Sequence, residues 1–157
     1  MKSITYGEVN IPQIRNIVES RIHSGIESIE ITVGTDSQSF ANFTKLVNVI
    51  AIRIGNRGGF FFYDFKTMPL ITSLRHKLTE ETSWSINTAC ELLDEIKHSE
   101  IKLLRDCKIV IHSDIGIHGP TNQLISEIVG WITASGFQCE IKPQSFAAST
   151  IADRLSK

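Results

Sequence analysis

The segment CKIVIHSDIG, residues 107–116, decides how this chain can fold. It opens with a short run of mostly β-branched and apolar residues, which predicts a buried strand. Asp114 follows at the end of that strand, where a carboxylate without a partner is costly. A second apolar stretch, IEITVGTDSQS at residues 29–39, raises the same problem with Asp36. Both strands therefore need something that binds the carboxylate at their ends.

The composition is that of a folded, nearly neutral protein. The 157 residues fit a single domain, residues 1–157, and 41% of them are hydrophobic, which is enough for a core. The net charge of -1 gives no overall attraction to nucleic acid or to membranes, although a local basic groove is still compatible with it. No apolar run approaches the ~18 residues of a membrane span, and the N-terminus lacks a signal-like apolar region. We therefore expect a cytoplasmic protein that does not bind membranes.

The three cysteines do not predict a redox or zinc site. Cys90, Cys107 and Cys139 lie far apart, and no C-x-x-C pair occurs. Each lies in or beside an apolar run, so we expect all three to pack in the core.

Hydrophobic periodicity predicts helices and strands in an alternating order. Helices are expected at residues 11–24, 71–99, 121–135 and 146–157, and residues 1–27 are expected to form an N-terminal helical extension. Strands are expected at residues 29–36, 45–55, 60–67, 107–113 and 137–143. The turn signal NRGG, residues 56–59, joins the second and third strands into a hairpin.

This order predicts an α/β fold with a five-stranded mixed sheet and helices on both faces. It resembles the ribonuclease H-like fold. Nucleases of that superfamily place acids on the first strand, in the first long helix, at the end of the fourth strand and often in the last helix. Asp36 and Asp114 stand at the two strand positions. Carboxylate oxygens suit hard divalent cations, and two such ions can drive phosphodiester hydrolysis.

Each aspartate could also have a purely structural role. Asp36 could cap its own backbone in a turn, and Asp114 could cap the glycine- and proline-bearing loop that follows it. For the helix position, two neighbouring acids compete. At about 100° per residue, Glu81 falls beside the apolar stripe that includes Leu74 and Leu92, whereas Glu80 falls almost opposite it. The helical phase therefore favours Glu81 as the acid that faces the sheet.

Four sequence blocks give a closer resemblance. VGTDSQ (33–38), EETSWSI (80–86), HSDIGIHGPT (112–121) and KPQSFAASTIADR (142–154) resemble the signature blocks of the YkuK-type proteins, a bacterial ribonuclease H-like family of predicted nucleases. The resemblance spans the chain from about residue 29 onward. It implies Asp36, Glu81, Asp114 and Asp153 as metal ligands. Asp153 is proposed on the resemblance alone, because its position in the last helix points away from the apolar stripe.

Histidines and basic residues near these blocks leave alternatives open. His118 could pass a proton to the leaving group, or it could be a plain loop histidine. The family commonly has a polar amide at that position, so the resemblance implies no role for His118. His112 could orient a carboxylate or a water, or it could be a buried structural histidine. Five basic residues could contact phosphates or be dispersed surface charge: Arg53, Arg57, Lys142, Arg154 and Lys157.

The phenylalanines at 60, 61, 62 and 65 alternate between both faces of their strand, so we expect them in the core.

The leading functional hypothesis is a nuclease that uses Mg²⁺ or Mn²⁺ to hydrolyse the phosphodiester bonds of RNA or DNA. Its catalytic residues would be Asp36, Glu81, Asp114, Asp153 and His118. A module that binds nucleic acid or a partner, and that keeps the fold without turnover, is the alternative. A phosphotransferase of the related actin-like fold is disfavoured, because the chain is too short for two such domains and has no glycine-rich phosphate loop.

Overall fold

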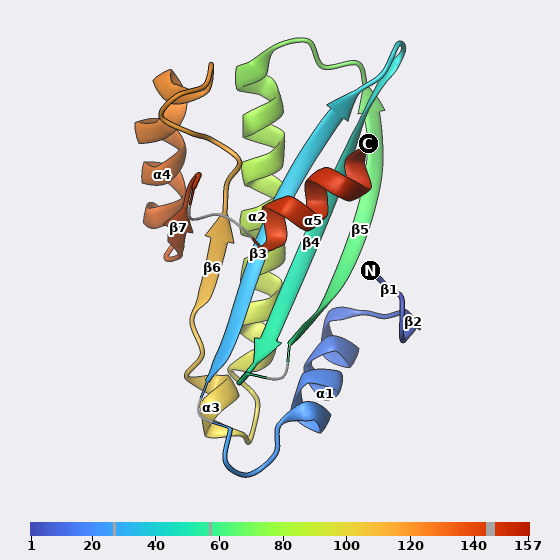
Figure 1. The fold of residues 1–157 in the computed structure, drawn as a ribbon, viewed down its shortest axis with the longest axis vertical. Coiled ribbons are helices and arrows are strands. Elements are labelled where there is room, and N and C mark those ends of the chain that lie inside the picture. The colour runs from blue at the N-terminus through green and yellow to red at the C-terminus, as the bar shows by residue number, and fades with distance from the viewer. Residues whose placement is uncertain (27, 57, 144–146) are drawn as a thin grey trace.

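A single mixed sheet organises the chain (Figure 1). The structure is a computed structural model that describes residues 1–26, 28–56, 58–143 and 147–157. Within these residues the sheet has seven strands in the order β2-β1-β5-β4-β3-β6-β7. The strands are β1 (Lys2–Ser3), β2 (Gly7–Glu8), β3 (Ile29–Ser39), β4 (Phe43–Ile54), β5 (Gly59–Pro69), β6 (Ile109–His112) and β7 (Gln138–Glu140). Neighbours from β2 to β3 pair antiparallel, whereas β6 pairs parallel with β3 and β7 parallel with β6.

Helices cover both faces of the sheet, as the sequence predicts. They are α1 (Ile11–Arg21), α2 (Leu74–Ile96), α3 (Lys102–Arg105), α4 (Ile125–Ala134) and α5 (Ala147–Ser156), and a 3-10 turn (Asn122–Leu124) precedes α4. In Figure 1, α2 runs behind the central strands and α5 crosses in front of β3 and β4. Phe146, where the last predicted helix begins, lies outside the described residues.

The prediction of five strands was wrong, because the described residues form seven. The two additional strands, β1 and β2, precede α1 in the segment expected to be helical. Each has only two residues, which is too short to show an alternating pattern in the sequence. They form because Lys2 pairs with Tyr63 of β5, a contact that only the folded sheet provides.

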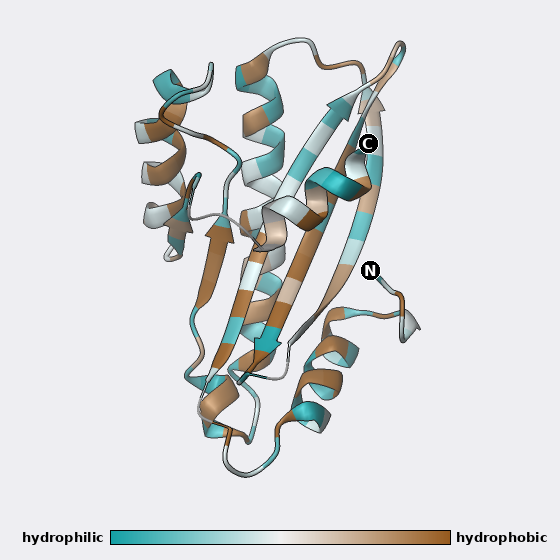
Figure 2. Cartoon of the chain, in the orientation of Figure 1, coloured by the Kyte–Doolittle hydropathy of each residue, from teal (hydrophilic) through white to brown (hydrophobic). Residues whose placement is uncertain are grey.

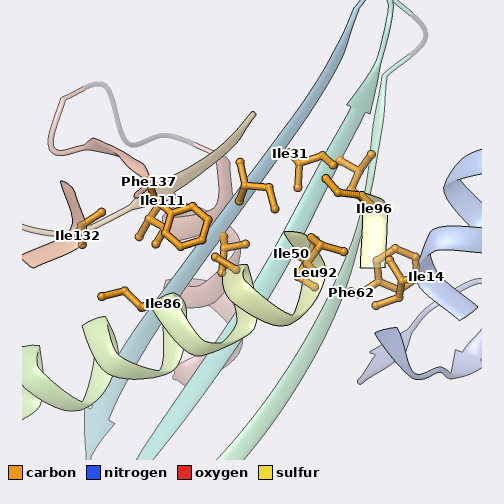
Figure 3. Close-up of a cluster of buried hydrophobic side chains, with 14 of the residues drawn as sticks. Ile14, Ile31, Ile50, Phe62, Ile86, Leu92, Ile96, Ile111, Ile132 and Phe137 are labelled. Atoms are coloured by element: carbon orange, nitrogen blue, oxygen red, sulfur yellow. The ribbon is translucent and has the colours of Figure 1, made fainter. Parts of the chain in front are cut away.

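The main core lies between the sheet and α2 (Figure 3). Ile50 and Phe62 project from the sheet toward Leu92 of α2, and all three are at most 1% exposed. Ile14 of α1 and Ile132 of α4 close this layer at opposite ends. Figure 2 shows β6 as mostly hydrophobic along its length, which is typical of a strand covered on both faces.

The opposite face of the sheet carries a smaller apolar cluster under α5. Its buried members are Val47, Val49, Ala51, Ala148 and Ala152. The alanines let the helix approach the strands closely, and Lys45 Nζ donates a hydrogen bond to Leu155 O at the end of α5, 2.7 Å away. A cation at a helix C-terminus is a favourable arrangement.

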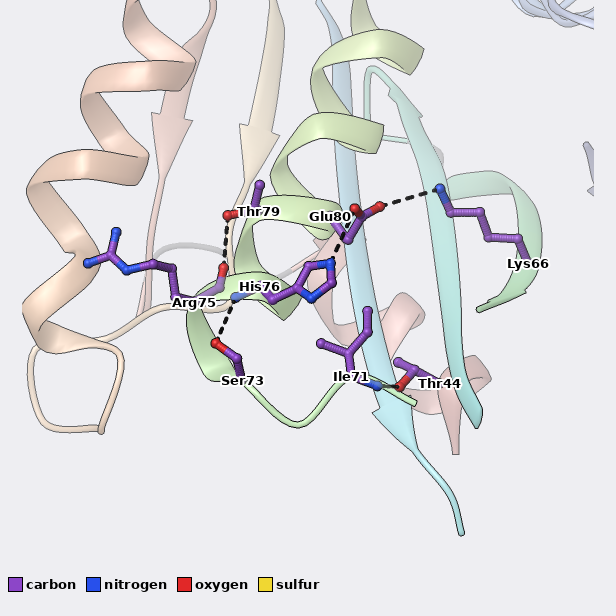
Figure 4. Close-up of polar contacts among 8 residues, drawn as sticks. All are labelled: Thr44, Lys66, Ile71, Ser73, Arg75, His76, Thr79 and Glu80. Atoms are coloured by element: carbon purple, nitrogen blue, oxygen red, sulfur yellow. Dashed lines mark hydrogen bonds and ion pairs between the residues drawn. The ribbon is translucent and has the colours of Figure 1, made fainter. Parts of the chain in front are cut away.

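Helix α2 begins three residues later than predicted. Ser73 caps it by accepting a hydrogen bond from the His76 backbone N–H, and the Ile71 N–H is drawn away to Thr44 Oγ1 (Figure 4). Ile71 is therefore buried without being helical, whereas Leu70 is exposed. At the other predicted helix end, Gly136 follows α4 with a φ of 93°, as expected of a C-terminal glycine.

Two predictions of buried side chains were wrong. Cys90 is exposed, although Cys107 and Cys139 are partly buried and all three are free thiols. Phe65 is 47% exposed, because it lies on β5 beyond the cover of α5. Lys2 and Lys45 place their ammonium groups over its ring instead, at 4.8 and 5.7 Å from the centroid.

Among the described residues, no helix combines the length and the apolar character that crossing a membrane requires.

Candidate functional site

The register of two parallel strands sets the candidate site. The β3–β6 pairing runs from Ile31 beside Ile109 to Gly34 beside His112, where β6 ends. The same register, continued by two residues, sets Asp36 beside Asp114. Adjacent strands lie about 4.8 Å apart, so the two carboxylates project from neighbouring positions on one face. The β3–β6 pairing ends at His112.

Helix α5 brings a second group of side chains to Asp36. Ser156 Oγ donates a hydrogen bond to Asp36 Oδ2 at 2.6 Å. Asp153, one turn earlier on the same helix, lies close enough for its charge to raise the pKa of Asp36. Its carboxylate is held by Lys157 Nζ at 2.9 Å. The last helix thus delivers one acid and one hydroxyl to the site.

Glu81 reaches the site from α2 on the other side of the sheet. Ser37 Oγ donates a short hydrogen bond to Glu81 Oε1. Burial raises the pKa of Glu81 to about 8, and the nearby charges of Asp36 and Asp114 add to the effect. Glu80 faces elsewhere, with its carboxylate 4.0 Å from Lys66 Nζ and 3.6 Å from His76 Nε2 (Figure 4). The two glutamates take the orientations that the helical phase predicts.

Asp114 forms an ion pair across the end of the sheet. Lys142, which follows β7, places Nζ 2.7 Å from Asp114 Oδ1. The Ser113 N–H donates to Glu140 O at 2.9 Å, so the β6–β7 alignment continues past the strand ends and sets Asp114 opposite Lys142. The loop-capping role considered for Asp114 is not what the described contacts show.

Negative charge accumulates at this point of the molecule. Burial raises the pKa of Asp36, and the charges of Asp114 and Asp153 raise it further, whereas the hydrogen bond from Ser156 opposes the shift. The charges of Asp114 and Asp153 thus act on Asp36, those of Asp36 and Asp114 act on Glu81, and Lys142 and Lys157 pair with Asp114 and Asp153. No group of three or more His, Cys, Asp or Glu side chains within the described ranges is arranged to hold a metal ion as it stands.

Comparisons with known proteins agree with this architecture. A family model described as Ribonuclease H-like matches residues 12–157. The uncharacterized protein YkuK of Bacillus subtilis (strain 168) is 33% identical over 138 residues, which cover 83% of this chain and 80% of that protein. The chain belongs to the ribonuclease H-like family. The resemblance to YkuK-type proteins is therefore confirmed.

Two of the five histidines, His112 and His118, were candidates for the site of this ribonuclease H-like chain, and they differ in environment. His112 is buried at the end of β6, with Nε2 3.0 Å from Glu140 Oε2 but without a well-aligned hydrogen bond. Burial lowers the pKa of His112, although Glu140 opposes the shift. His118 is exposed in the loop after Asp114 and lines a cavity with Asp114 and Lys142.

The basic residues that were considered as phosphate contacts lie in different environments. Lys142 and Lys157 contact site carboxylates. Arg53 lies 3.8 Å from Glu30 in an exposed pair, and Arg154 is exposed on α5. Arg57 lies outside the described residues.

The sequence did not point to Ser37 and Ser156 as partners of the acids. Ser37 follows Asp36 directly and therefore projects to the α2 face, so strand alternation could have suggested that it meets Glu81. No comparable signal exists for Ser156, which reaches Asp36 only because α5 crosses β3.

Proposed function

We propose that this chain is a divalent-metal-dependent nuclease that hydrolyses phosphodiester bonds of RNA or DNA. One observation carries the proposal. The β3–β6 register, continued by two residues, sets Asp36 beside Asp114, and the pKa values of Asp36 and Glu81 respond to the charges of neighbouring acids on β3, α5 and the end of β6. Burial and neighbouring acids raise the pKa of Asp36 and of Glu81, so a bound cation would offset a cost that these two carboxylates bear. A structural role alone gives no reason for it.

The donors suit Mg²⁺ or Mn²⁺ in type. All four are carboxylates, which hard cations prefer, and neither a thiol nor a neutral imidazole is in contact with them. Asp36, Glu81, Asp114 and Asp153 would hold the ions. Bound there, the ions would stabilise the charge that develops on the phosphate oxygens and would activate a water.

The remaining side chains orient the acids. Ser37 fixes the Glu81 carboxylate, and Ser156 fixes one oxygen of Asp36, which leaves the other oxygens free to bind a cation. Lys142 and Lys157 pair with Asp114 and Asp153 through exposed ammonium groups. Exposed ion pairs are worth about 0–1 kcal/mol, so a cation can displace both lysines at little cost. Once displaced, each lysine is free to contact a substrate phosphate.

The alternative is a module that binds nucleic acid or a partner without turnover. Two observations favour it: the lysines already neutralise two of the acids, and the described side chains form no ready-made metal group. Membership of the ribonuclease H-like family is compatible with both functions, because function is carried by sites and not by folds.

A metal titration with matched variants tests the site. Mn²⁺ or Mg²⁺ should raise the melting temperature of the wild type, because a ligand that binds only the folded state stabilises it. Glu81→Gln should lose most of this rise. Glu80→Gln, one residue along the same helix, should keep it. If Glu80→Gln lost the response and Glu81→Gln kept it, the assignment of Glu81 would be wrong.

A cleavage screen separates the nuclease from the binding module. Labelled RNA, DNA and hybrid strands are incubated with the wild type and Mg²⁺ or Mn²⁺, and Asp114→Asn serves as the inactive control. Without metal, Asp114→Asn should melt at or above the wild type, because it removes a repelling charge. Metal-dependent cleavage that Asp114→Asn abolishes would establish the nuclease. Metal binding without cleavage of any strand would favour the binding module.

A further inference from the structure

A cavity of about 620 Å³ opens directly beside the candidate site. Its walls are mostly apolar and come from the loop after β6 and the segment after β7. Six of its lining residues matter here: Asp114, Ile117, His118, Pro120, Lys142 and Pro143. Ile117 is 56% exposed, so its side chain is accessible to a ligand in the cavity.

The cavity shares Asp114 and Lys142 with the carboxylate site. If Asp114 binds the cations that act on a phosphodiester, the scissile phosphate lies at the edge of this cavity. The nucleoside next to that phosphate must then lie within reach of it. The imidazole of His118 is a ring on which a nucleobase can stack, and Ile117, Pro120 and Pro143 offer apolar contact beside it.

The net charge of the chain gives phosphate contacts no long-range support. A protein that grips a duplex through its phosphates needs a basic surface, and this chain has a net charge of -1. Its two lysines at the site are already engaged by Asp114 and Asp153. Contacts to the base would add affinity to the phosphate contacts that the lysines make once a cation has displaced them, and a base inside a duplex cannot offer its faces without leaving the stack.

We propose that the cavity receives an unpaired nucleobase next to the scissile phosphate, and that the substrate is therefore single-stranded nucleic acid. This inference rests on the proposed function for the position of the phosphate. Ile117 and His118 contact the base, and Lys142, once released from Asp114, contacts the phosphate beside it.

The test is a thermodynamic cycle between the cavity wall and the base. Binding of a labelled ten-nucleotide single strand is measured by fluorescence anisotropy with Mg²⁺ present. The protein carries Asp36→Asn throughout, because this change prevents cleavage without altering the cavity wall. An abasic position is moved along the strand. One abasic position should weaken binding about tenfold, which is typical of the loss of one stacked base.

Two cavity variants complete the cycle. With Ile117→Ser or His118→Ala, the intact strand should bind about as weakly as the abasic strand, and the abasic position should cause no further loss. Both side chains are exposed, so neither change should impair folding. Ile4→Ser is the matched control, because Ile4 is 83% exposed near the β1–β2 edge of the sheet, opposite β6 and β7.

Several results would overturn the inference. Fully additive losses from the abasic position and Ile117→Ser would show that the cavity does not hold the base. A duplex that binds as tightly as the single strand, or a mononucleotide that does so, would refute the substrate class. A change from dimer to monomer in Ile117→Ser, measured by sedimentation, would assign the cavity to a second copy of the chain.

The thermodynamic cycle tests the base-binding cavity, and the cleavage screen tests the nuclease, so the two proposals can be refuted independently. If the binding losses are coupled but the wild type cleaves no strand, the base-binding cavity is supported and the nuclease proposal is refuted. If the wild type cleaves a strand but the binding losses are additive, the nuclease proposal is supported and the base-binding cavity is refuted.

Discussion

The two faces of the sheet differ in the side chains that they bury. On the α2 face, large aliphatic and aromatic side chains fill the core, and the buried polar groups satisfy one another: Thr35 bonds Ser85 at 2.7 Å, and Asn48 bonds Thr35 at 2.8 Å. On the α5 face, a short helix covers a few valines and alanines, and Asp36, whose pKa is raised by burial, lies beside it. Stability and candidate chemistry are thus separated by the sheet, and Glu81 alone among the four acids comes from the α2 side.

The largest effect should come from the α2 face. Leu92 is 1% exposed in the main core, so Leu92→Ala removes contacts that cannot be replaced and should lower the free energy of unfolding by about 2–5 kcal/mol. Leu74→Ala on the same helix is the control, because Leu74 is 39% exposed. Urea denaturation measures both. Equal losses for the two variants would mean that the main core is not where the fold is stabilised.

Glu81 makes stability depend on pH. The folded state holds the Glu81 proton up to a pKa of about 8, whereas the unfolded chain releases it near 4.5. The folded state therefore binds more protons between these values, and stability should fall as pH rises from about 4.5 to about 8. The fall should be on the order of a few kcal/mol, since each pKa unit corresponds to about 1.4 kcal/mol.

Glu81→Gln should flatten this pH dependence, and Glu80→Gln should not. Thermal unfolding in the presence of a chelator, from pH 5 to pH 8, measures it. A wild type whose stability rises across that range would show that Glu81 is ionised in the folded protein.

The α5 face should respond more weakly to a packing change. Ala152 is fully buried against the strands, so Ala152→Leu overpacks the contact and should cost about 1–3 kcal/mol. Because α5 holds Ser156 against Asp36, the same variant should also lose part of its melting-temperature response to Mn²⁺. Ala134→Leu, at an exposed position of α4, is the control. An unchanged Mn²⁺ response in a destabilised Ala152→Leu would separate α5 from the site.

The smallest effect concerns the thiols. Burial raises the pKa of Cys107 and of Cys139 to about 11, so little thiolate forms at pH 8, whereas Cys90 is exposed. Iodoacetamide should therefore modify Cys90 first, which peptide mass spectrometry measures. Equal modification of all three cysteines in the folded protein would mean that the two buried thiols open readily to solvent.

The elements of the fold and the orientation of several candidate site residues could be predicted from the sequence, because both follow from hydrophobic periodicity. Apolar runs located the strands that end near Asp36 and Asp114, and the helical phase separated Glu81 from Glu80. The same phase places Cys90 with Ser83 and Asn87 on the polar side of α2, so its burial was wrongly expected from apolar neighbours alone. The order of elements suggested that β3 lies beside β6, and the pairing confirms it.

What the sequence could not supply depends on contacts between distant segments. The strands β1 and β2 exist only through their pairing onto β5. Lys142 meets Asp114 because β7 lies beside β6, a neighbour that no local pattern encodes. By contrast, the pair of Lys157 with Asp153 follows an i,i+4 spacing and could have been predicted from the helix.

The hydrogen bond from Ser156 to Asp36 joins residues 120 positions apart. Contacts between such distant segments are slow to form, because the loop between them must be closed before the contact stabilises it. The hairpins of β3, β4 and β5 are local and can form early. In refolding, recovery of Mn²⁺ binding should therefore lag behind recovery of the backbone signal. A partly folded chain would carry all four acids and still be unable to bring them together.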